Sequence, residues 1–278
     1  MTMIAMTREM GSLGRDVATR LAERMNRKVV YHEIIDQMAS KSRVRKSHVA
    51  RFLEGGASLL ERLTAEKTSV SIFTADETFR FVRDGSVGVL RGWGATHLLR
   101  SVPHVVRVRV CAPLALRIER MMSRLGTDDR ASVENEILMN EEAHTAIARR
   151  HFGIDWRDPE HYDVVLSTER LSVDECVAEV ENLMRMERFR ETPESLQSAE
   201  NLSLEWSVRA ALKRDARTAG VAIGVECREG RARLYGIVDR QAEADAVAEV
   251  AAGVEGVREV ASELKSAQSA ASRSRRQS

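Results

Sequence analysis

Residues 11–16, Gly-Ser-Leu-Gly-Arg-Asp, place two glycines, a hydroxyl, a cation and a carboxylate in one short turn. Residues 3–7, which are apolar except for Thr7, precede this turn and are expected to form a strand. Residues 17–26 after it carry apolar side chains at spacings of three and four, which is typical of a helix. A strand that turns through glycines into a helix directs several backbone N–H groups and the positive end of the helix dipole at one point. The stretch therefore predicts a phosphate-binding turn. The alternative is a plain strand–helix corner whose glycines only allow positive φ.

The turn matches neither of two common phosphate-binding templates. In a P-loop, G-x-x-x-x-G-K-[ST], the lysine reaches the β- and γ-phosphates and the hydroxyl holds Mg²⁺. When the helix starts are aligned, Gly14 takes the lysine position and Arg8 takes the position of the first glycine. The dinucleotide template G-x-G-x-x-G also fails, because no acidic residue closes a second strand at the required distance. The side chains predict an unusual phosphate site and argue against a dinucleotide-dependent oxidoreductase.

The elements that must position this turn alternate between strands and helices over residues 1–189. Strands are expected at 3–7, 28–32, 86–90, 104–111 and 162–168, and helices at 17–26, 33–41, from 113 onward, at 132–151 and at 172–188, the last with Ser172 as N-cap. Residues 42–85 are mixed, and Gly55-Gly56 divides their helical spacing into two helices. This alternation predicts an α/β fold with a parallel sheet. The ligand should lie beyond the carboxyl ends of the strands, where 11–16, 91–94 and 112–113 all fall.

The composition excludes several classes of protein. The 278 residues suffice for two domains, and 43 basic against 42 acidic residues give a net charge of +1, so no global field attracts nucleic acid or a membrane surface. Arg8 and Glu9 interrupt the N-terminus before a signal-peptide run forms, and no apolar run approaches the ~18 residues of a membrane span. The three cysteines lack C-x-x-C spacing, which favours reduced thiols with a packing role. We expect a cytoplasmic protein without a specific nucleic-acid partner.

A second pattern follows a polar stretch, residues 190–201, which contains Pro193 and is predicted to be a linker. Residues 202–265 predict a small α/β unit: a helix to about 218, strands at 221–227 and 232–238 joined by a turn at Glu229-Gly230, a helix at 241–252 and a strand at 257–264. The basic tail 266–278 is predicted to be disordered from its composition. A basic stripe at helical spacing could meet an anionic surface, with a solvated helix as the alternative: Arg209, Lys213, Arg214 and Arg217.

Four stretches of the first 189 residues together resemble the cytidylate kinase-like family, a branch of the nucleoside monophosphate kinases. They are Thr-Arg-Glu-Met-Gly-Ser-Leu-Gly-Arg at 7–15, Arg-Val-Arg-Val-Cys-Ala-Pro-Leu-Ala-Leu-Arg-Ile-Glu-Arg at 107–120, Phe-Gly-Ile-Asp-Trp-Arg-Asp-Pro at 152–159 and Tyr-Asp-Val-Val-Leu-Ser-Thr at 162–168. Residues 202–265 resemble a BON domain, a module proposed to bind phospholipid or other ligands, through 225–230, 234–238 and 253–260. The resemblance implies a P-loop fold, a nucleoside-monophosphate region around 32–85 and an arginine-bearing lid.

Enzymes of that family transfer the γ-phosphoryl group of ATP to CMP or a similar nucleotide with Mg²⁺, and such catalysis depends mainly on positioning and charge neutralisation. By resemblance, Gly11, Ser12 and Gly14 offer the loop's backbone and Arg15 is the replacement cation. Asp16 could hold Mg²⁺, or it is simply an acid in a first helical turn. The other cations implied are Arg91 for the acceptor's phosphate, and Arg117, Arg120 and Arg124 as lid or hinge arginines, or else as a solvated face paired with acids such as Glu119.

Three residues depart from the family pattern. Leu13 stands where a glycine is usual, Trp93 stands in the turn Arg91-Gly-Trp-Gly where Gly-Arg-Gly is common, and His144 stands where an arginine aligns. Arg91 could substitute for the missing arginine of the turn, whereas a neutral imidazole neutralises no phosphate at pH 7. Two hypotheses follow. The protein is an ATP-dependent nucleoside monophosphate kinase, or it is a catalytically degenerate nucleotide sensor acting through the BON-like module, which could bind a lipid or small ligand or mediate a homodimer.

Overall fold

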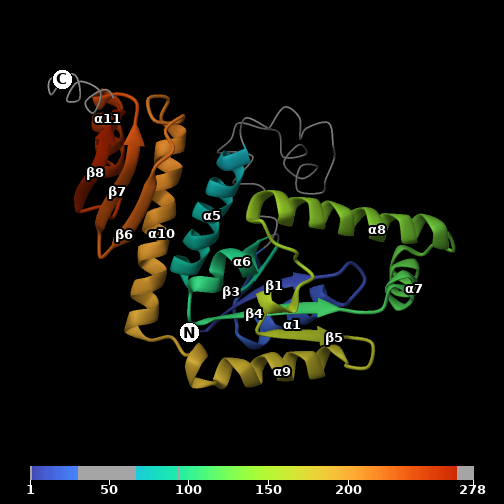
Figure 1. Cartoon of the computed structure of the whole chain (residues 1–278). Helices are drawn as coiled ribbons and strands as arrows, with labels where there is room; N and C mark the ends of the chain where they lie inside the picture. The colour runs from blue at the N-terminus through green and yellow to red at the C-terminus, as the bar shows by residue number, and fades with distance from the viewer. Residues whose placement is uncertain (1, 31–66, 93, 268–278) are drawn as a thin grey trace. The chain divides into compact units, whose positions relative to one another are not determined.

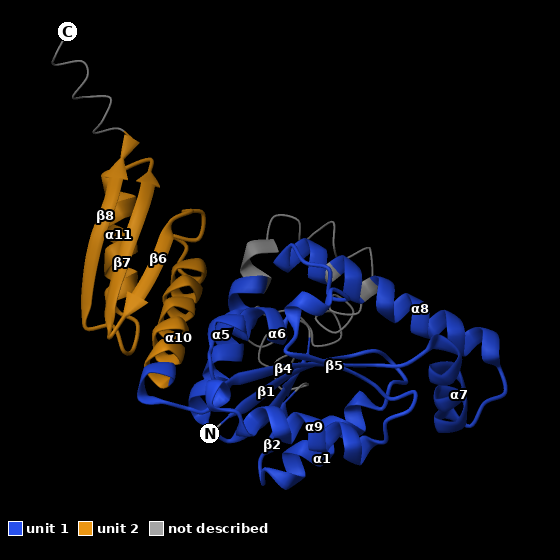
Figure 2. Ribbon diagram, turned by 60° about the horizontal axis from the view of Figure 1, so that its bottom comes forward, with its two compact units in different colours: residues 1–195 blue, residues 196–278 orange. Residues whose placement is uncertain are grey.

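The computed structural model describes residues 2–30, 67–92 and 94–267. The chain divides into two compact units, Met1–Ser195 and Leu196–Ser278, which Figure 2 shows in blue and orange. Several predictions fall outside the described residues. These are the helix expected at 33–41, the part of the mixed region 42–85 up to residue 66 with its break at Gly55-Gly56, the place of Trp93, and the tail from 268 onward.

Five parallel strands form the sheet of the first unit, in the order β2-β3-β1-β4-β5. They are β1 (Met3–Arg8), β2 (Lys28–Val30), β3 (Val87–Arg91), β4 (Val105–Cys111) and β5 (Val164–Ser167). Strand β1 lies in the middle, pairs with β3 and β4, and is buried over residues 3–7. A parallel strand covered by helices on both faces must be apolar on both sides, which explains the unbroken run Met-Ile-Ala-Met. The predicted α/β fold with a parallel sheet is confirmed.

Helices cover both faces of this sheet (Figure 1). They are α1 (Gly14–Arg24), α5 (Lys67–Asp84), α6 (Ala95–Leu98), α7 (Leu114–Leu125), α8 (Arg130–Ile147) and α9 (Val173–Arg185), with short 3₁₀ turns at 99–101, 159–161 and 187–189 and a π turn at 148–152. Helices α1 and α9 pack together on one face, where Val17, Leu21 and Val177 join the strand residues in one buried cluster. Helices α5 and α6 contact β3 and β1. As predicted, Ser172 caps α9, in a capping box with Glu175.

Helices α7 and α8 pack against each other beside the loop that follows β1. Ile118 of α7 meets Val133 and Ile137 of α8 in a small buried cluster, and Met10 of that loop packs against it. The two helices therefore stand at the carboxyl ends of the central strands, where the sequence pattern placed the ligand.

The second unit is built on a three-stranded sheet in the order β6-β7-β8. Its elements are α10 (Pro193–Arg214), β6 (Gly224–Arg228), β7 (Arg231–Val238), α11 (Gln241–Ala252) and β8 (Glu259–Ser266). Strands β6 and β7 form an antiparallel hairpin through the predicted turn at Glu229 and Gly230, both at positive φ (47° and 82°), as a tight two-residue hairpin turn requires. Helix α11 connects β7 to the parallel strand β8. Val208, Leu234 and Val247 are fully buried in this unit's core, which confirms the small α/β fold.

Residues 190–201, which are predicted to be a linker, are helical from Pro193 onward, and the boundary between the two units falls among them. Helix α10 begins at Pro193 and ends at Arg214, instead of running from 202 to about 218. Proline is well suited to the first helical position, where its missing N–H has no partner in any case, so Pro193 opens the helix. The hydroxyl of Thr192 accepts a hydrogen bond from the N–H of Ser195 at 3.2 Å and caps the helix. None of the helices in the described part of the chain is both long enough and apolar enough to span a bilayer.

Candidate functional site

The loop between β1 and α1 is folded around a single carbonyl. The N–H and the hydroxyl of Ser12 both donate to the carbonyl oxygen of Glu9, at 3.2 and 2.7 Å. Gly11 (φ 81°) and Leu13 (φ 60°) both adopt the left-handed conformation, and α1 starts at Gly14. A leucine in this conformation costs about 1–2 kcal/mol relative to a glycine, which the rest of the loop must offset.

Both glycines of the turn are required, for partly different reasons. A Cβ at Gly11 would lie 2.7 Å from the carbonyl oxygen of Arg117, and φ is positive there as well. A Cβ at Gly14 would lie 2.6 Å from Cβ of Arg8 and 3.1 Å from Cβ of Val110. Close packing of β1, β4 and the start of α1 therefore excludes a side chain at Gly14. Unlike Gly11, Gly14 does not have a positive φ, so the requirement there is only one of space.

The loop presents backbone donors to one place. Among the described residues, the N–H groups of Gly11, Leu13, Gly14 and Arg15 have no hydrogen-bond partner. Three of these groups belong to the N-terminal cap and first turn of α1, where no intrahelical partner exists and the helix dipole is positive. Ser12, which is predicted to offer its backbone as well, is fully buried, and its N–H donates to the carbonyl of Glu9.

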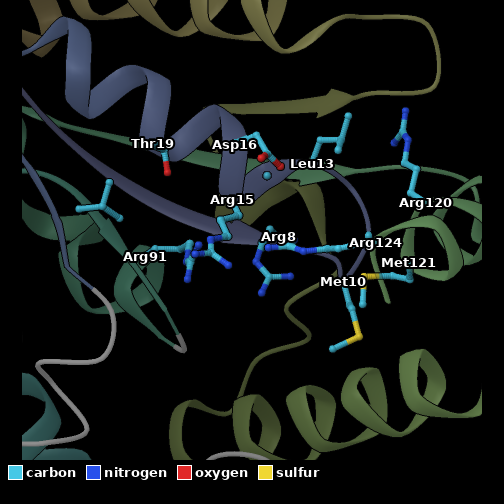
Figure 3. A pocket seen from close by; sticks show the side chains of 13 residues that line it. Arg8, Met10, Leu13, Arg15, Asp16, Thr19, Arg91, Arg120, Met121 and Arg124 are labelled. Atoms are coloured by element: carbon cyan, nitrogen blue, oxygen red, sulfur yellow. The ribbon is translucent and has the colours of Figure 1, made fainter. Parts of the chain in front are cut away.

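A cavity of about 460 Å³ opens beside the loop (Figure 3). Its lining comes from the end of β1, the loop, α1, β2, β3 and α7, and consists of Arg8, Met10, Gly11, Leu13, Gly14, Arg15, Asp16, Thr19, Val29, Arg91, Arg120, Met121 and Arg124. Five of these residues are arginines and one is a carboxylate. In Figure 3, Arg8, Arg15, Arg91 and Arg124 lie toward the centre of the view and Arg120 lies at its right. Guanidinium groups and backbone N–H donors together suit a ligand with several phosphate groups.

The structure brings most of the predicted site residues to this cavity. Those lining it are Gly11, Gly14, Arg15, Asp16, Arg91, Arg120 and Arg124. Arg91 is buried, at 9% exposed, whereas Arg15, Asp16 and Arg124 are exposed. Sequence reasoning missed Arg8 and Thr19. Two signals were available: Arg8 is the first charged residue after a buried strand, and Thr19 follows Arg15 by one helical turn.

Arg117 lies below the loop and is not among the residues that line the cavity. It is 5% exposed, its Nε donates to the carbonyl of Ala112 at 2.9 Å, and its Nη1 lies 2.6 Å from a carboxylate oxygen of Glu141. Its Nε also lies 3.5 Å from Glu9. Arg117 was predicted to act alongside Arg120 and Arg124, but it lies apart from them: its guanidinium contacts the carboxylates and the carbonyl that hold the loop, and it does not line the cavity.

Glu9 and Glu141 belong to one buried network of charges under the cavity. Glu9 contacts Arg109 at 2.7 Å and accepts a hydrogen bond from the N–H of Ala112 at 3.2 Å. Glu141 on α8 contacts Arg157 at 2.8 Å in addition to Arg117. The network ties the loop to the end of β4 and to both helices α7 and α8, so the backbone donors are held in place before any ligand arrives.

His144 on α8 adds no positive charge to this region at neutral pH. Its ring stacks on Trp156, with centroids 4.1 Å apart and planes 14° apart. Burial, together with the cations Arg8, Arg109 and Arg157, lowers its pKa from 6.5 to about 3. A small hollow of about 50 Å³ next to the main cavity is lined by Met6, Thr7, Arg8, Arg91, Gly92, Asn140 and His144. The sequence-based expectation of a neutral His144 therefore agrees with its surroundings.

Asp16 is the one carboxylate among the residues that line the cavity, and Thr19, three residues later on α1, adds a hydroxyl to the lining. The described part of the chain contains no cluster of three or more His, Cys, Asp or Glu side chains able to hold a metal ion alone. Mg²⁺ is commonly bound through one or two carboxylates together with substrate phosphates and water. The residues present fit a Mg²⁺ ion held largely by phosphate oxygens, with Asp16 as the protein's contribution.

The basic stripe predicted on the second unit is not a bare cationic surface. Arg209 pairs with Glu205 at 2.9 Å and donates to the carbonyl of Val225 at 2.8 Å. Lys213 donates to the carbonyl of Ala219 at 2.6 Å. Arg217 pairs with Asp215 and Glu249, each at 2.9 Å, and these partners raise its pKa. These contacts favour the alternative of a structural and solvated helix.

The family model of the cytidylate kinase-like family matches residues 3–170, which include the loop, the cavity and the network beneath it. The chain belongs to the cytidylate kinase-like family. The BON domain model matches residues 203–268, so both resemblances are confirmed in their predicted order. No curated protein matches the sequence.

Two solved structures resemble the chain. An uncharacterized protein from Eubacterium ventriosum ATCC 27560 is 18% identical with a TM-score of 0.52, over 66% of this chain and 98% of that one. This likeness supports the fold of the first unit. Shikimate kinase from Acinetobacter baumannii, solved in complex with shikimate, is 14% identical with a TM-score of 0.40, over 66% of this chain and 93% of that one.

Proposed function

We propose that the first unit binds ATP with its phosphates in the arginine-lined cavity and transfers the γ-phosphoryl group to a nucleoside monophosphate, CMP or a similar nucleotide. One observation carries the proposal: five arginines line a single cavity together with the unpartnered loop N–H groups of Gly11, Leu13 and Gly14. In phosphoryl transfer the protein acts mainly by positioning and by neutralising charge, so cations and backbone donors are the groups that matter. Membership of the cytidylate kinase-like family supports the same reaction class.

In this proposal each residue's role follows from its position in the cavity. The loop N–H groups bind the donor's phosphates, and Arg15 neutralises the transferring group from the first turn of α1. Arg91, at the carboxyl end of β3, faces the acceptor's phosphate, whose oxygen attacks the γ-phosphorus as the bond to the β-phosphate oxygen breaks and ADP leaves. Arg124 and Arg120 of α7 stabilise the charge that spreads over the γ-oxygens. Mg²⁺, held by Asp16 and the phosphates, would supply further charge neutralisation.

A second candidate is a nucleotide sensor without turnover, whose state is read out through the BON domain. The neutral His144, stacked on Trp156 where an arginine aligns in the family, favours it. Loss of one cation from a phosphoryl-transfer site can cost on the order of 10³–10⁵ in rate. The sensor predicts the same ATP affinity as the kinase but no transfer to any acceptor.

The test pairs binding with turnover on the full-length protein. Calorimetric titration with ATP and Mg²⁺ measures the affinity, and an ADP-release assay scans CMP, dCMP, UMP and AMP as acceptors. Turnover on one acceptor establishes the kinase and names its substrate. Saturable ATP binding without turnover establishes the sensor. If ATP does not bind, both candidates fail and the loop is a strand–helix corner.

A further inference from the structure

Thr168 connects the phosphate loop to an arginine of α7, although it does not line the cavity. It follows β5 directly and is 1% exposed. Its hydroxyl donates to the carbonyl oxygen of Ser12 at 2.9 Å, and it accepts a hydrogen bond from Nη1 of Arg120 at 2.9 Å. Nη2 of Arg120 donates to the carbonyl of Thr168 itself at 2.8 Å. A hydroxyl has one proton to donate and two lone pairs to accept with, so the side chain fits both contacts at once.

The bond to Ser12 fixes the direction of a donor in the cavity. No peptide bond among the described residues is cis, so the C=O of Ser12 and the N–H of Leu13 point in opposite directions in one rigid plane. Thr168 holds that C=O on the buried side of the loop. The N–H of Leu13 is thereby turned away from Thr168, and Leu13 itself lines the cavity. Leu13 has a positive φ of 60°, which a leucine rarely adopts. A contact from outside the loop, such as the one with Thr168, is therefore needed to keep this peptide plane in its orientation.

The bonds to Arg120 fix a cation at the same time. Two of the three guanidinium nitrogens of Arg120 donate to Thr168, which restrains a side chain that would otherwise lose rotamer freedom on binding a ligand. Arg124, one turn further along α7, is exposed and has no such restraint among the described residues. One buried hydroxyl thus sets the orientation of both a loop donor and an arginine in the cavity.

We propose that Thr168 is a positioning residue for polyphosphate binding. Its hydroxyl couples the Leu13 N–H to the Arg120 guanidinium, so that the direction of the donor and the position of the cation are both set before the ligand arrives. The inference rests on the proposed function only in that the ligand of the cavity carries phosphate groups; it needs no assumption about the acceptor or about turnover.

The test compares variants that differ only in the hydroxyl. Thr168→Val has the same shape without the hydroxyl, and Thr168→Ser keeps the hydroxyl. The matched control is Thr218→Val: Thr218 is also 1% exposed and its hydroxyl donates to a backbone carbonyl, that of Leu212 at 2.6 Å, in the second unit. Calorimetry with ATP and, separately, with inorganic tripolyphosphate measures the affinity, and thermal unfolding verifies each fold.

We expect Thr168→Val to weaken binding of both ligands by about tenfold, the size of one to two hydrogen bonds, with Thr168→Ser within about twofold of the wild type and Thr218→Val unchanged. In an Arg120→Ala background the loss caused by Thr168→Val should shrink, because the two residues act through one contact.

Equal affinity of Thr168→Val and the wild type, or equal losses for Val and Ser, would overturn the inference while leaving the proposed function standing. Should Thr168→Val not fold, Thr168→Ala against Thr168→Ser tests the same hydroxyl. If the wild type binds neither ligand, the proposed function fails and the inference fails with it.

Discussion

The carboxylate of Glu9 lies 2.7 Å from the guanidinium of Arg109, and the two side chains are 11% and 12% exposed. Glu9 belongs to the loop that opens the cavity, and Arg109 belongs to the neighbouring strand β4. The same carboxylate accepts the N–H of Ala112 at 3.2 Å. A charge pair that is nearly closed to solvent therefore fixes the start of the phosphate loop on the sheet.

The first prediction concerns this pair. Replacing Glu9 with Gln should lower the free energy of unfolding by about 3 kcal/mol, because Arg109 would keep a nearly buried charge without its carboxylate partner, and Arg117 would keep Glu141 alone. Urea denaturation measures the change. The matched control is Asp174→Asn, which breaks a surface pair with Arg20 at 3.0 Å whose side chains are 61% and 49% exposed. That variant should cost less than about 1 kcal/mol. Similar small losses for both variants would contradict a structural role for the network.

The sequence predicted the sheet, its flanking helices and the place of the phosphate loop, because these depend on local periodicity and on strand ends. It could not separate Arg117 from Arg120 and Arg124, which share one helix at spacings of three and four. Arg117 is buried because Glu9 and Glu141 approach it, and those partners lie far away in the sequence. Side chains that meet only in the folded chain leave no local pattern.

The start of helix α10, which the sequence analysis placed at 202, was predicted wrongly for a different reason. Residues 190–201 are polar and contain a proline, which is equally true of a linker and of a solvated helix start. What decides between them is the cap at Thr192 and the burial of Ser195, whose hydroxyl lies 3.0 Å from Nδ1 of His104, directly before β4. This contact joins positions that no periodicity argument connects.

The second prediction concerns Gly14. Alanine there should weaken ATP binding and lower the free energy of unfolding by about 1–3 kcal/mol, because its methyl group would lie 2.6 Å from Cβ of Arg8 and force the loop to shift. Calorimetry and thermal unfolding measure the two effects. Gly220→Ala is the control, since a Cβ there meets nothing within 4 Å and φ is not positive. It should leave both quantities nearly unchanged. A Gly14→Ala variant that behaves like Gly220→Ala would show that the loop tolerates a side chain.

The third prediction is a pH dependence from His144. Its pKa is about 3 in the folded chain, below the value of 6.5 for an unfolded histidine. Between these values the unfolded chain binds a proton that the folded chain does not, so His144 lowers stability as pH falls, by up to about 1.4 kcal/mol per pH unit. The contribution is absent above pH 6.5 and complete near pH 3.

The variant His144→Phe separates this group from other titrating residues. Phenylalanine can keep the stack on Trp156 but takes up no proton. Its melting temperature should therefore fall less steeply than that of the wild type between pH 6.5 and pH 4. Some dependence should persist, because burial and Arg100 lower the pKa of His97 to about 4 as well. Parallel curves for the two proteins would mean that His144 is protonated in the folded chain.

The fourth prediction concerns Arg15, the cation of the first turn of α1. Arg15→Ala should reduce phosphoryl transfer by about 10³-fold or more, since a guanidinium beside the transferring group stabilises charge that develops in the transition state. Its side chain is exposed, so the melting temperature should stay close to that of the wild type. Initial rates of ADP release with the best acceptor measure the loss.

The control for Arg15 is Arg20→Ala on the same helix. Arg20 is also exposed, but it pairs with Asp174 at 3.0 Å and is not among the residues that line the cavity. Both variants remove one positive charge from α1, so a general loss of electrostatic attraction would affect them alike. Only Arg15 stands beside the loop donors, and only its removal should abolish transfer. If the two variants retain equal activity, the replacement cation lies elsewhere, and Arg8, at the end of β1 in the same cavity, is the next to replace.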